Sequence, residues 1–380
     1  LFATLAAWMA VRWRDRGGNR WGVLFVLSFW LGLLSNLSVA LILPVLFLYV
    51  ATPHGGTRGR PLAATVALLA LVLVESPWIM QYAERMAWER LVPAREAVPG
   101  EQPLRGKTTF DIGGYPFTIS SFAVGYTLGP PLRELHLGSP WRVVLAYWHV
   151  LLPTAFLFGL LALRGLAVLA RSPHRLLFVL GLVLVPVLGV TYAALQNFKV
   201  FNPRYISAGI SGFYLLLTAG WLAFTPRLRV WIATGVLLLW GLSLWNHFFV
   251  EKYGKEDYRA ATFWLAEQIS PEDQLIASAN YAPLNYYWRD RQPQYEPYWI
   301  GHTRDPETLV SKFVELEDST RVTWVVVSRS FWHDPEGRLD SYLVEERGAR
   351  VDRFPGVQIY RLPPLLPASA EGTEKGPRAS

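Results

Sequence analysis

The sequence has no cysteine and only three methionines in 380 residues. Without thiols the chain can form neither disulfide bonds nor thiolate metal sites, and its cysteine content does not identify a redox compartment. Charge is also scarce where the hydrophobic residues gather: 52% of the residues are hydrophobic, 17% are charged, and the apolar ones are grouped in long runs. That grouping argues against a water-soluble chain and indicates that lipid surrounds much of the protein.

Several catalytic and binding patterns are missing as well. No group of His and Glu has the spacing of metal ligands, no Gly-rich loop follows a predicted strand to hold a nucleotide, and no Ser/His/Asp arrangement can be argued. The net charge of +7 does not indicate nucleic acid, because the basic residues form no single stripe interleaved with aromatic ones. They lie instead in short loops between the apolar runs.

The apolar runs lack the period of two that a strand requires, so we expect them to form helices that cross a ~30 Å hydrocarbon core. The predicted helical membrane domain covers residues 1–250, with spans at about 21–34, 37–50, 62–81, 141–163, 176–195, 205–224 and 230–249, and with a long outer loop over 82–140. The chain begins at Leu1 with an apolar stub over residues 1–11 that is too short to span, so we expect further spans to precede it.

Four short basic loops set the predicted orientation, since Lys and Arg favour the cytoplasmic side. They contain Arg12, Arg14, Arg16 and Arg20; Arg58 and Arg60; Arg164, Arg171 and Arg175; and Arg227 and Arg229. The first two loops can both lie on the cytoplasmic side of the membrane only if residues 21–34 and 37–50 form a short hairpin that turns at Asn36. Each arm is only ~20 Å long, so we expect the turn at membrane depth or at the outer face, buried in protein or facing a water-filled cavity.

Residues 251–363 distribute their charges evenly, which favours a small extracytoplasmic α/β domain. We expect helices over 258–269, 306–316 and 339–346, and strands over 274–278, 322–328 and 357–362. Alternating helices and strands predict a mostly parallel sheet with helices on its faces. The tail over 364–380 is predicted to be disordered. The expected fold class is thus a polytopic α-helical membrane protein followed by this small extracytoplasmic α/β domain.

The short outer loop before the span 205–224 is the main candidate binding site. It places Lys199 and Arg204 beside a helix start at Pro203 and Tyr205. A bidentate arginine and a lysine point charge near the positive end of a helix dipole suit a phosphate or pyrophosphate. The alternative left open is that both cations only anchor the helix at lipid headgroups.

Three other polar residues are candidates. Glu75 lies about one turn below the outer end of an otherwise apolar span, where it could take part in chemistry, reach water or pair with a cation. Asn36 lies at the hairpin turn, where broken helices can line a membrane cavity. Arg259 stands at the start of the first helix of the outer domain, where it either faces the cavity or forms a surface ion pair with Glu256 or Asp257.

The order of four features resembles the GT-C membrane glycosyltransferases. These are the short hairpin, the outer loop with its segment 122–131, Pro203-Arg204-Tyr205 opening a span, and Lys255-Glu256-Asp257-Tyr258-Arg259 opening the soluble domain. The likeness covers nearly the whole chain and is greatest to bacterial members related to protein O-mannosyltransferases and the aminoarabinose transferase of lipid A (glycosyltransferase family 39 type). It implies transfer of a sugar from a polyprenyl-phosphate donor to a protein, lipid or polysaccharide acceptor, on the extracytoplasmic face of a bacterial inner membrane.

The resemblance also implies roles for single residues. Arg204 and Lys199, with Tyr205 and Arg259, would bind the donor phosphate or line the substrate cavity. The acidic residue that acts as general base in the family, or that holds a divalent metal in some members, lies in the first outer loop. We expect that loop upstream of Leu1, so the catalytic carboxylate is unassigned.

Two readings from other classes stay open. A transporter or flippase of a lipid-linked substrate would use the same cationic loop and the same broken turn, although the chain shows no inverted repeat and few ionisable groups in its spans. A non-catalytic membrane scaffold would use the outer domain to bind a partner. A pair of carboxylates in an outer loop just after the first span would favour glycosyl transfer, and its absence would favour the other two readings.

Overall fold

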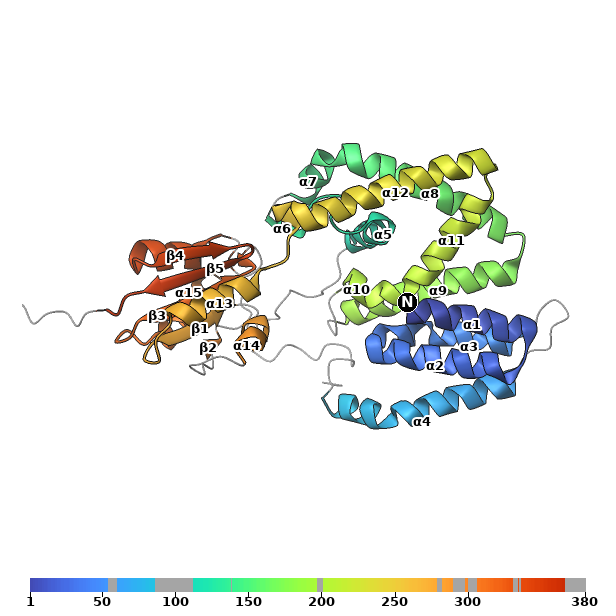
Figure 1. The fold of residues 1–380 in the computed structure, drawn as a ribbon, viewed down its shortest axis with the longest axis horizontal. Coiled ribbons are helices and arrows are strands. Elements are labelled where there is room, and N and C mark those ends of the chain that lie inside the picture. The colour runs from blue at the N-terminus through green and yellow to red at the C-terminus, as the bar shows by residue number, and fades with distance from the viewer. Residues whose placement is uncertain are drawn as a thin grey trace, which may run out of the picture. The chain divides into compact units, whose positions relative to one another are not determined.

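The structure, a computed structural model, describes residues 1–53, 60–85, 112–137, 139–196, 201–278, 282–289, 298–299, 306–330, 334 and 336–365. The chain divides into two compact units: Leu1–Gly129 with Trp148–Leu244, and Pro130–Tyr147 with Trp245–Ser380. The first unit consists of helices, and the second contains a β-sheet with helices beside it (Figure 1). The inclusion of Pro130–Tyr147 in the second unit was not predicted from the sequence.

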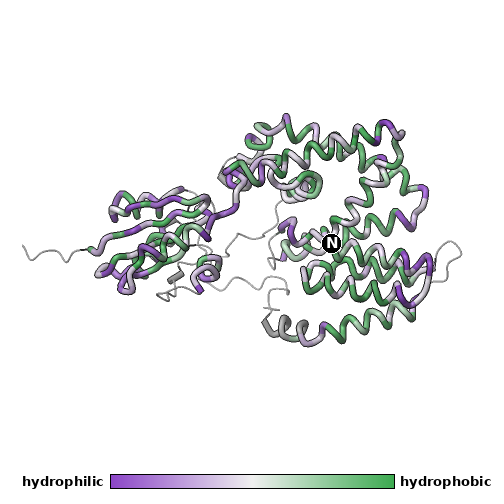
Figure 2. The backbone as a smooth tube through the Cα atoms, viewed as in Figure 1, coloured by the Kyte–Doolittle hydropathy of each residue, from purple (hydrophilic) through white to green (hydrophobic). Residues whose placement is uncertain are grey.

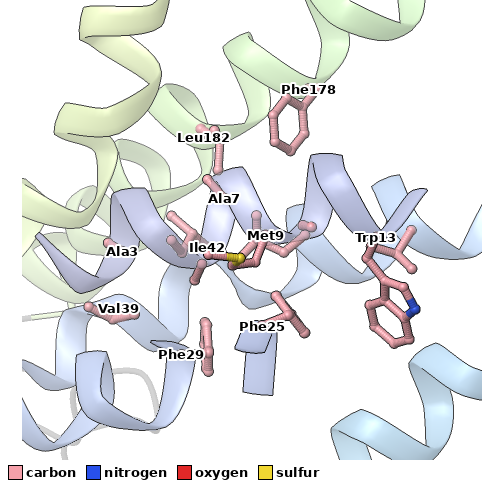
Figure 3. Close-up of a cluster of buried hydrophobic side chains, with 14 of the residues drawn as sticks. Ala3, Ala7, Met9, Trp13, Phe25, Phe29, Val39, Ile42, Phe178 and Leu182 are labelled. Carbon is pink, nitrogen blue, oxygen red and sulfur yellow. The ribbon is translucent and has the colours of Figure 1, made fainter. Parts of the chain in front are cut away.

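Helix α1 (Phe2–Arg16) contains the apolar stub expected at the N-terminus and continues past it to Arg16; it is not among the described helices that are long and apolar enough to cross a membrane. Its buried alanines recur every three or four residues and form one face of small side chains, made of Ala3, Ala6, Ala7 and Ala10. Small residues let helix backbones approach closely, and this face packs against the neighbouring helices α2 (Asn19–Ser35) and α3 (Leu43–Ala51). Figure 3 shows the resulting cluster, with Ala7, Phe25, Phe29, Ile42 and Leu182 among its labelled members.

The break between α2 and the next helical segment lies at the predicted turn. Helix α2 ends at Ser35, Asn36 is extended, and the 3₁₀ segment η1 (Leu37–Ile42) leads into α3. Helix α4 (Pro61–Arg85) follows and is longer than the predicted span at 62–81. Helix α4 contacts both α2 and α3. Helices α1, α2, α3 and α4 and the segment η1 therefore form one helical group.

The rest of the first unit is built around longer helices. Its elements are α5 (Gly114–Val124), α8 (Trp148–Leu169), α9 (Pro173–Leu195), α10 (Pro203–Ile206), η3 (Ser207–Gly209), α11 (Ile210–Leu222) and most of α12 (Pro226–Phe249). Figure 2 shows these helices hydrophobic along most of their length, with hydrophilic residues near several of their ends.

Among the described residues, four helices are long and apolar enough to cross a membrane, and they suggest a membrane protein. They are Trp148–Leu169, Pro173–Leu195, Pro203–Leu222 and Pro226–Phe249. The side on which each loop lies stays a prediction. The expected span 141–163 is placed differently in the structure: Pro140–Ala146 forms a separate short helix, α7, and α8 begins only after Tyr147. The apolar run is continuous there, so hydropathy alone could not locate the break.

Helices α8 and α11 cross at two glycines. A Cβ on Gly165 would lie 2.1 Å from the carbonyl oxygen of Leu216, and one on Gly220 would lie 1.9 Å from that of Leu161. Each glycine therefore faces the backbone of the other helix directly. This reciprocal contact is the close approach that small residues permit between helices in lipid.

The second unit contains a mixed sheet with the strand order β2-β1-β3-β5-β4. Its strands are β1 (Gln274–Ser278), the two-residue β2 (Tyr298–Trp299), β3 (Thr323–Ser328), β4 (Arg350–Phe354) and β5 (Val357–Leu362). Strand β1 is parallel to β2 and β3, whereas β5 is antiparallel to both β3 and β4. The expectation of a mostly parallel sheet is corrected, because β4 precedes β5 and the chain reverses between them, which makes β5 antiparallel to β4 and β3. Strand β4 was missed because it is charged and largely exposed and lacks the apolar alternation that predicts a strand.

Helices cover both faces of this sheet, as the alternating side chains of the strands require. Leu275 and Ala277 face α13 (Tyr258–Gln268) and α14 (Ala282–Trp288). Ile276, between them, faces the opposite side, which is covered by α15 (Pro306–Leu316), α17 (Arg338–Ser341) and the π-helical turn η5 (Tyr342–Glu346). Helix α14 and strands β2 and β4 had not been predicted.

Candidate functional site

Two helices of the first unit are broken, and the breaks meet. The side chain of Asn36, between α2 and η1, donates from Nδ2 to Oγ of Ser207 at 3.1 Å. Ser207 opens η3, the 3₁₀ segment that interrupts the predicted span 205–224. The structure therefore brings the predicted hairpin turn against the start of the predicted span 205–224, 171 residues later in the chain and just after the candidate phosphate-binding loop.

The same capping interaction of an asparagine side chain is present at both breaks. The Oδ1 atom of Asn36 accepts from the backbone N–H of Ser38 at 3.0 Å, and Oδ1 of Asn202 accepts from that of Arg204 at 2.9 Å. An asparagine at this position satisfies a backbone donor that the start of a helix leaves without a partner. At the second break, Pro203 then fits the first helical position, where no backbone donor is needed.

Hydroxyl groups line the contact between the broken helices. Thr4 and Ser211 share a hydrogen bond of 2.9 Å beside the Asn36–Ser207 pair. The Oγ atom of Ser38 is buried, and within the described part of the chain no group hydrogen-bonds to it. A buried hydroxyl without a hydrogen-bond partner is unusual, because leaving its hydrogen bonds unmade costs free energy.

Arg204 is the cation at this site. Its side chain is exposed, and no described residue forms an ion pair or a side-chain hydrogen bond with it. Helix α10 has only four residues before η3 begins, so the helix dipole expected from a continuous span contributes little here. Tyr205 is partly buried and packs in the core of the unit. Lys199 lies outside the described residues, so its pairing with Arg204 stays a prediction.

Helix α5, inside the predicted outer loop 82–140, is packed beside this site. A Cβ on Gly114 would lie 2.6 Å from the ring of Phe201, and the Tyr115 ring meets that ring edge-on at 5.3 Å. At the other end of α5, Tyr214 and Trp240 donate hydrogen bonds of 2.8 and 2.7 Å to the last carbonyls of the helix. The segment is thus a fixed part of the bundle, a placement that its sequence did not reveal.

The other two candidates lie apart from this contact. Glu75 is 5% exposed on α4, and its Oε1 atom has no hydrogen-bond partner among the described residues. Close to it in the chain, α4 forms one side of an apolar groove of about 230 Å³, which is lined by Val26, Leu27, Trp30, Leu71 and Val74. No hydrogen bond or ion pair links Glu75 to Asn36 or Arg204 in the described structure.

Arg259 belongs to the second unit and does not form the expected surface ion pair. Its guanidinium lies 5.6 Å from the ring centre of Phe263. Glu256 pairs instead with Arg329, whose Nε is 2.6 Å away, and Asp257 caps α13 by accepting from the N–H of Ala260. The aromatic contact replaces the predicted pairing because both carboxylates already have other partners.

One polar cluster was missed by the sequence analysis. Both carboxylate oxygens of Glu134 lie 3.0 and 3.1 Å from the Tyr147 hydroxyl, which also accepts from Nζ of Lys252 at 3.1 Å. Burial, reinforced by Glu134, raises the pKa of the Tyr147 phenol, and the hydrogen bond that Lys252 donates to Tyr147 raises the pKa of Lys252. No sequence signal links residues 105 positions apart.

The described residues do not suit a metal ion, since no three His, Cys, Asp or Glu side chains among them lie close together. The divalent metal allowed by the resemblance therefore has no ligand set in this part of the chain. Comparisons of the chain with protein-family models, with curated proteins and with solved structures found no match.

Proposed function

We propose that this protein is a membrane glycosyltransferase of the GT-C type. It takes a sugar from a polyprenyl-phosphate donor and transfers it to a protein, lipid or polysaccharide acceptor on the extracytoplasmic face of a bacterial inner membrane. The observation that supports this most is the exposed guanidinium of Arg204, without an ion-pair partner among the described residues, beside the meeting point of two broken helices. A lipid phosphate at the end of apolar helices needs such a cation.

The chemistry is a displacement at the anomeric carbon. The acceptor oxygen forms a bond to that carbon, the bond from carbon to the phosphate oxygen breaks, and the electron pair leaves with the phosphate. The acceptor proton passes to a carboxylate base, which is not assigned among the described residues. Arg204 stabilises the charge on the departing phosphate.

Replacing Arg204 tests the proposal. We expect Arg204→Ala in the full-length protein to reduce transfer from a polyprenyl-phosphate sugar by about 10²-fold, the loss typical of one charge-stabilising donor. Arg204→Lys should retain part of the rate, because it keeps the charge but loses the bidentate geometry. The measurement is turnover of radiolabelled donor in proteoliposomes. Arg171→Ala, which removes another exposed arginine from a short loop, is the matched control and should leave turnover unchanged.

A transporter or flippase of the lipid-linked substrate is the second candidate. The contact between two broken helices favours it, since interrupted helices build substrate sites in transporters. The same proteoliposomes separate the two functions. Movement of an intact donor between leaflets without release of polyprenyl phosphate would indicate transport, whereas release of polyprenyl phosphate that requires an acceptor would indicate transfer.

A further inference from the structure

A group of large apolar side chains in the second unit is exposed. Trp141 and Leu145, four residues apart on one face of α7, are 78% and 66% exposed, and Trp245, Phe248 and Phe249 at the end of α12 are 60%, 70% and 69% exposed. Exposing such large apolar side chains to water costs free energy. We therefore expect these faces of α7 and α12 to contact an apolar environment.

Polar groups occupy the same segment and are tied together. The Glu134–Tyr147–Lys252 cluster joins the end of α7 to η4 (Glu251–Tyr253), which directly follows α12. Lys252 also lies over the rings of Tyr147 and Tyr253, at 5.2 and 4.9 Å from their centres, while its side chain stays exposed. Aromatic rings combined with an exposed ammonium are typical of the boundary between hydrocarbon and water.

The position along α12 agrees with such a boundary. Arg229, in the first turn of α12 at the start of this candidate span, lies 20 residues before Phe249. At 1.5 Å per residue the two are about 30 Å apart along the helix, which equals the thickness of the hydrocarbon core. If Arg229 lies at one interface, Phe249 and Lys252 reach the other.

We propose that Trp141, Leu145, Trp245, Phe248, Phe249 and Lys252 form an interfacial collar that lies in the lipid headgroup layer. The apolar members enter the outer edge of the acyl chains, and Lys252 binds the phosphate of anionic phospholipids. Tyr147 holds Lys252 in place from one side and is itself held by Glu134. This placement depends on the membrane boundary alone and is independent of the glycosyltransferase proposal.

Spin labels test the depth of the collar, because the chain has no native cysteine. The protein is labelled at Trp141→Cys or Leu145→Cys in nanodiscs that contain phosphatidylglycerol and phosphatidylcholine. Leu237→Cys, 63% exposed in the middle of α12, marks the hydrocarbon core, and Lys312→Cys, exposed on α15, marks water. We expect the ratio of collisions with oxygen to those with a water-soluble nickel complex to fall between the two markers at both collar positions.

Three outcomes would overturn the proposal. A ratio equal to that of Lys312→Cys would place α7 in water, and a ratio equal to that of Leu237→Cys would make α7 part of a span. Protection from both reagents would show that a protein partner covers the face.

The role of Lys252 is tested by headgroup binding. We expect Lys252→Gln to weaken the binding of phosphatidylglycerol, measured by native mass spectrometry, by about fivefold, the factor for one cation at a membrane surface. Binding of phosphatidylcholine should not change. Lys255→Gln, an exposed lysine three residues further along, is the control. Equal effects of the two variants would show a general charge effect and contradict a specific contact at Lys252.

Discussion

The carboxylate of Glu256 holds together three segments at the start of the α/β domain. Glu256 pairs with Arg329, which directly follows β3 and has a φ of 51°, in the left-handed region that non-glycine residues seldom adopt. Gly356, in the turn between β4 and β5, packs so closely that a Cβ there would lie 2.9 Å from Cγ of Glu256. Through Glu256 the start of α13, the end of β3 and this turn are held together.

This pair predicts a dependence of stability on pH. Burial disfavours the charged form of Glu256, but the hydrogen bond and charge of Arg329 outweigh it and lower the pKa of the carboxyl. Because the folded pKa is below the unfolded one of about 4.5, the pair stabilises the fold above that pH and is lost as the pH falls through the folded value. We expect Glu256→Gln to lower stability by at most about 1 kcal/mol at pH 7 and by less at pH 3, because the contribution of the pair declines as the pH falls below the unfolded pKa.

The measurement for Glu256→Gln is thermal unfolding of the full chain, followed at both pH values by tryptophan fluorescence. Glu267→Gln, an exposed carboxylate on the same helix α13, serves as the control and should not change stability at either pH. A stability loss that is equal at pH 7 and pH 3 would show that the ion pair is not the cause.

Some of these residue-scale features follow from sequence and others do not. The turn at Asn36 was predictable, because asparagine between two apolar runs both interrupts a helix and caps the next one. Its bond to Ser207 was not, since the order of helices in a bundle does not specify which breaks lie at the same level. Arg204 was identified from charge and position alone, whereas the absence of a carboxylate partner among the described residues required the structure.

At the scale of elements, the crossing of α8 and α11 depends on glycine. We expect Gly165→Ala to destabilise the helical unit by about 1–3 kcal/mol, because the added methyl would meet the backbone of Leu216, which cannot move aside as a side chain can. Gly159→Ala is the matched control on the same helix, where nothing lies within 4 Å of the new Cβ. That change should be neutral or stabilise α8 by up to about 1 kcal/mol. Thermal unfolding in detergent measures both, and equal melting temperatures would contradict the close crossing.

Hydropathy located most helices to within a few residues, because a long apolar run has few alternatives to a helix in lipid. It failed at α7, where the run continues through a break that Tyr147 and its tertiary partners define. In the α/β domain, β1 and β5 were predicted with their observed bounds. Strand β4 was not, since exposed Arg350, Asp352 and Arg353 resemble a loop by composition.

For the whole molecule, labelling of single cysteines tests the predicted membrane orientation. We expect Ser35→Cys and Ser139→Cys, both exposed, to react with a membrane-impermeant maleimide added to intact cells. Asn19→Cys and Arg171→Cys, also exposed, should react only after the membrane is permeabilised, because both lie in predicted cytoplasmic loops. The chain has no cysteine of its own, so the unsubstituted protein is the blank. Reaction of Asn19→Cys from outside would contradict the hairpin and the alternation of spans that depends on it.

Strand β4 has a consequence for how the protein behaves among its neighbours. It lies at an edge of the sheet, where unpaired backbone groups invite a strand from another molecule. If the β4 edges of two copies paired, the exposed charges of β4 would lose their hydration and would lie beside those of the second copy. Both effects cost free energy. The arginines and aspartate that hid β4 from prediction therefore act against self-association of the sheet domain through this edge.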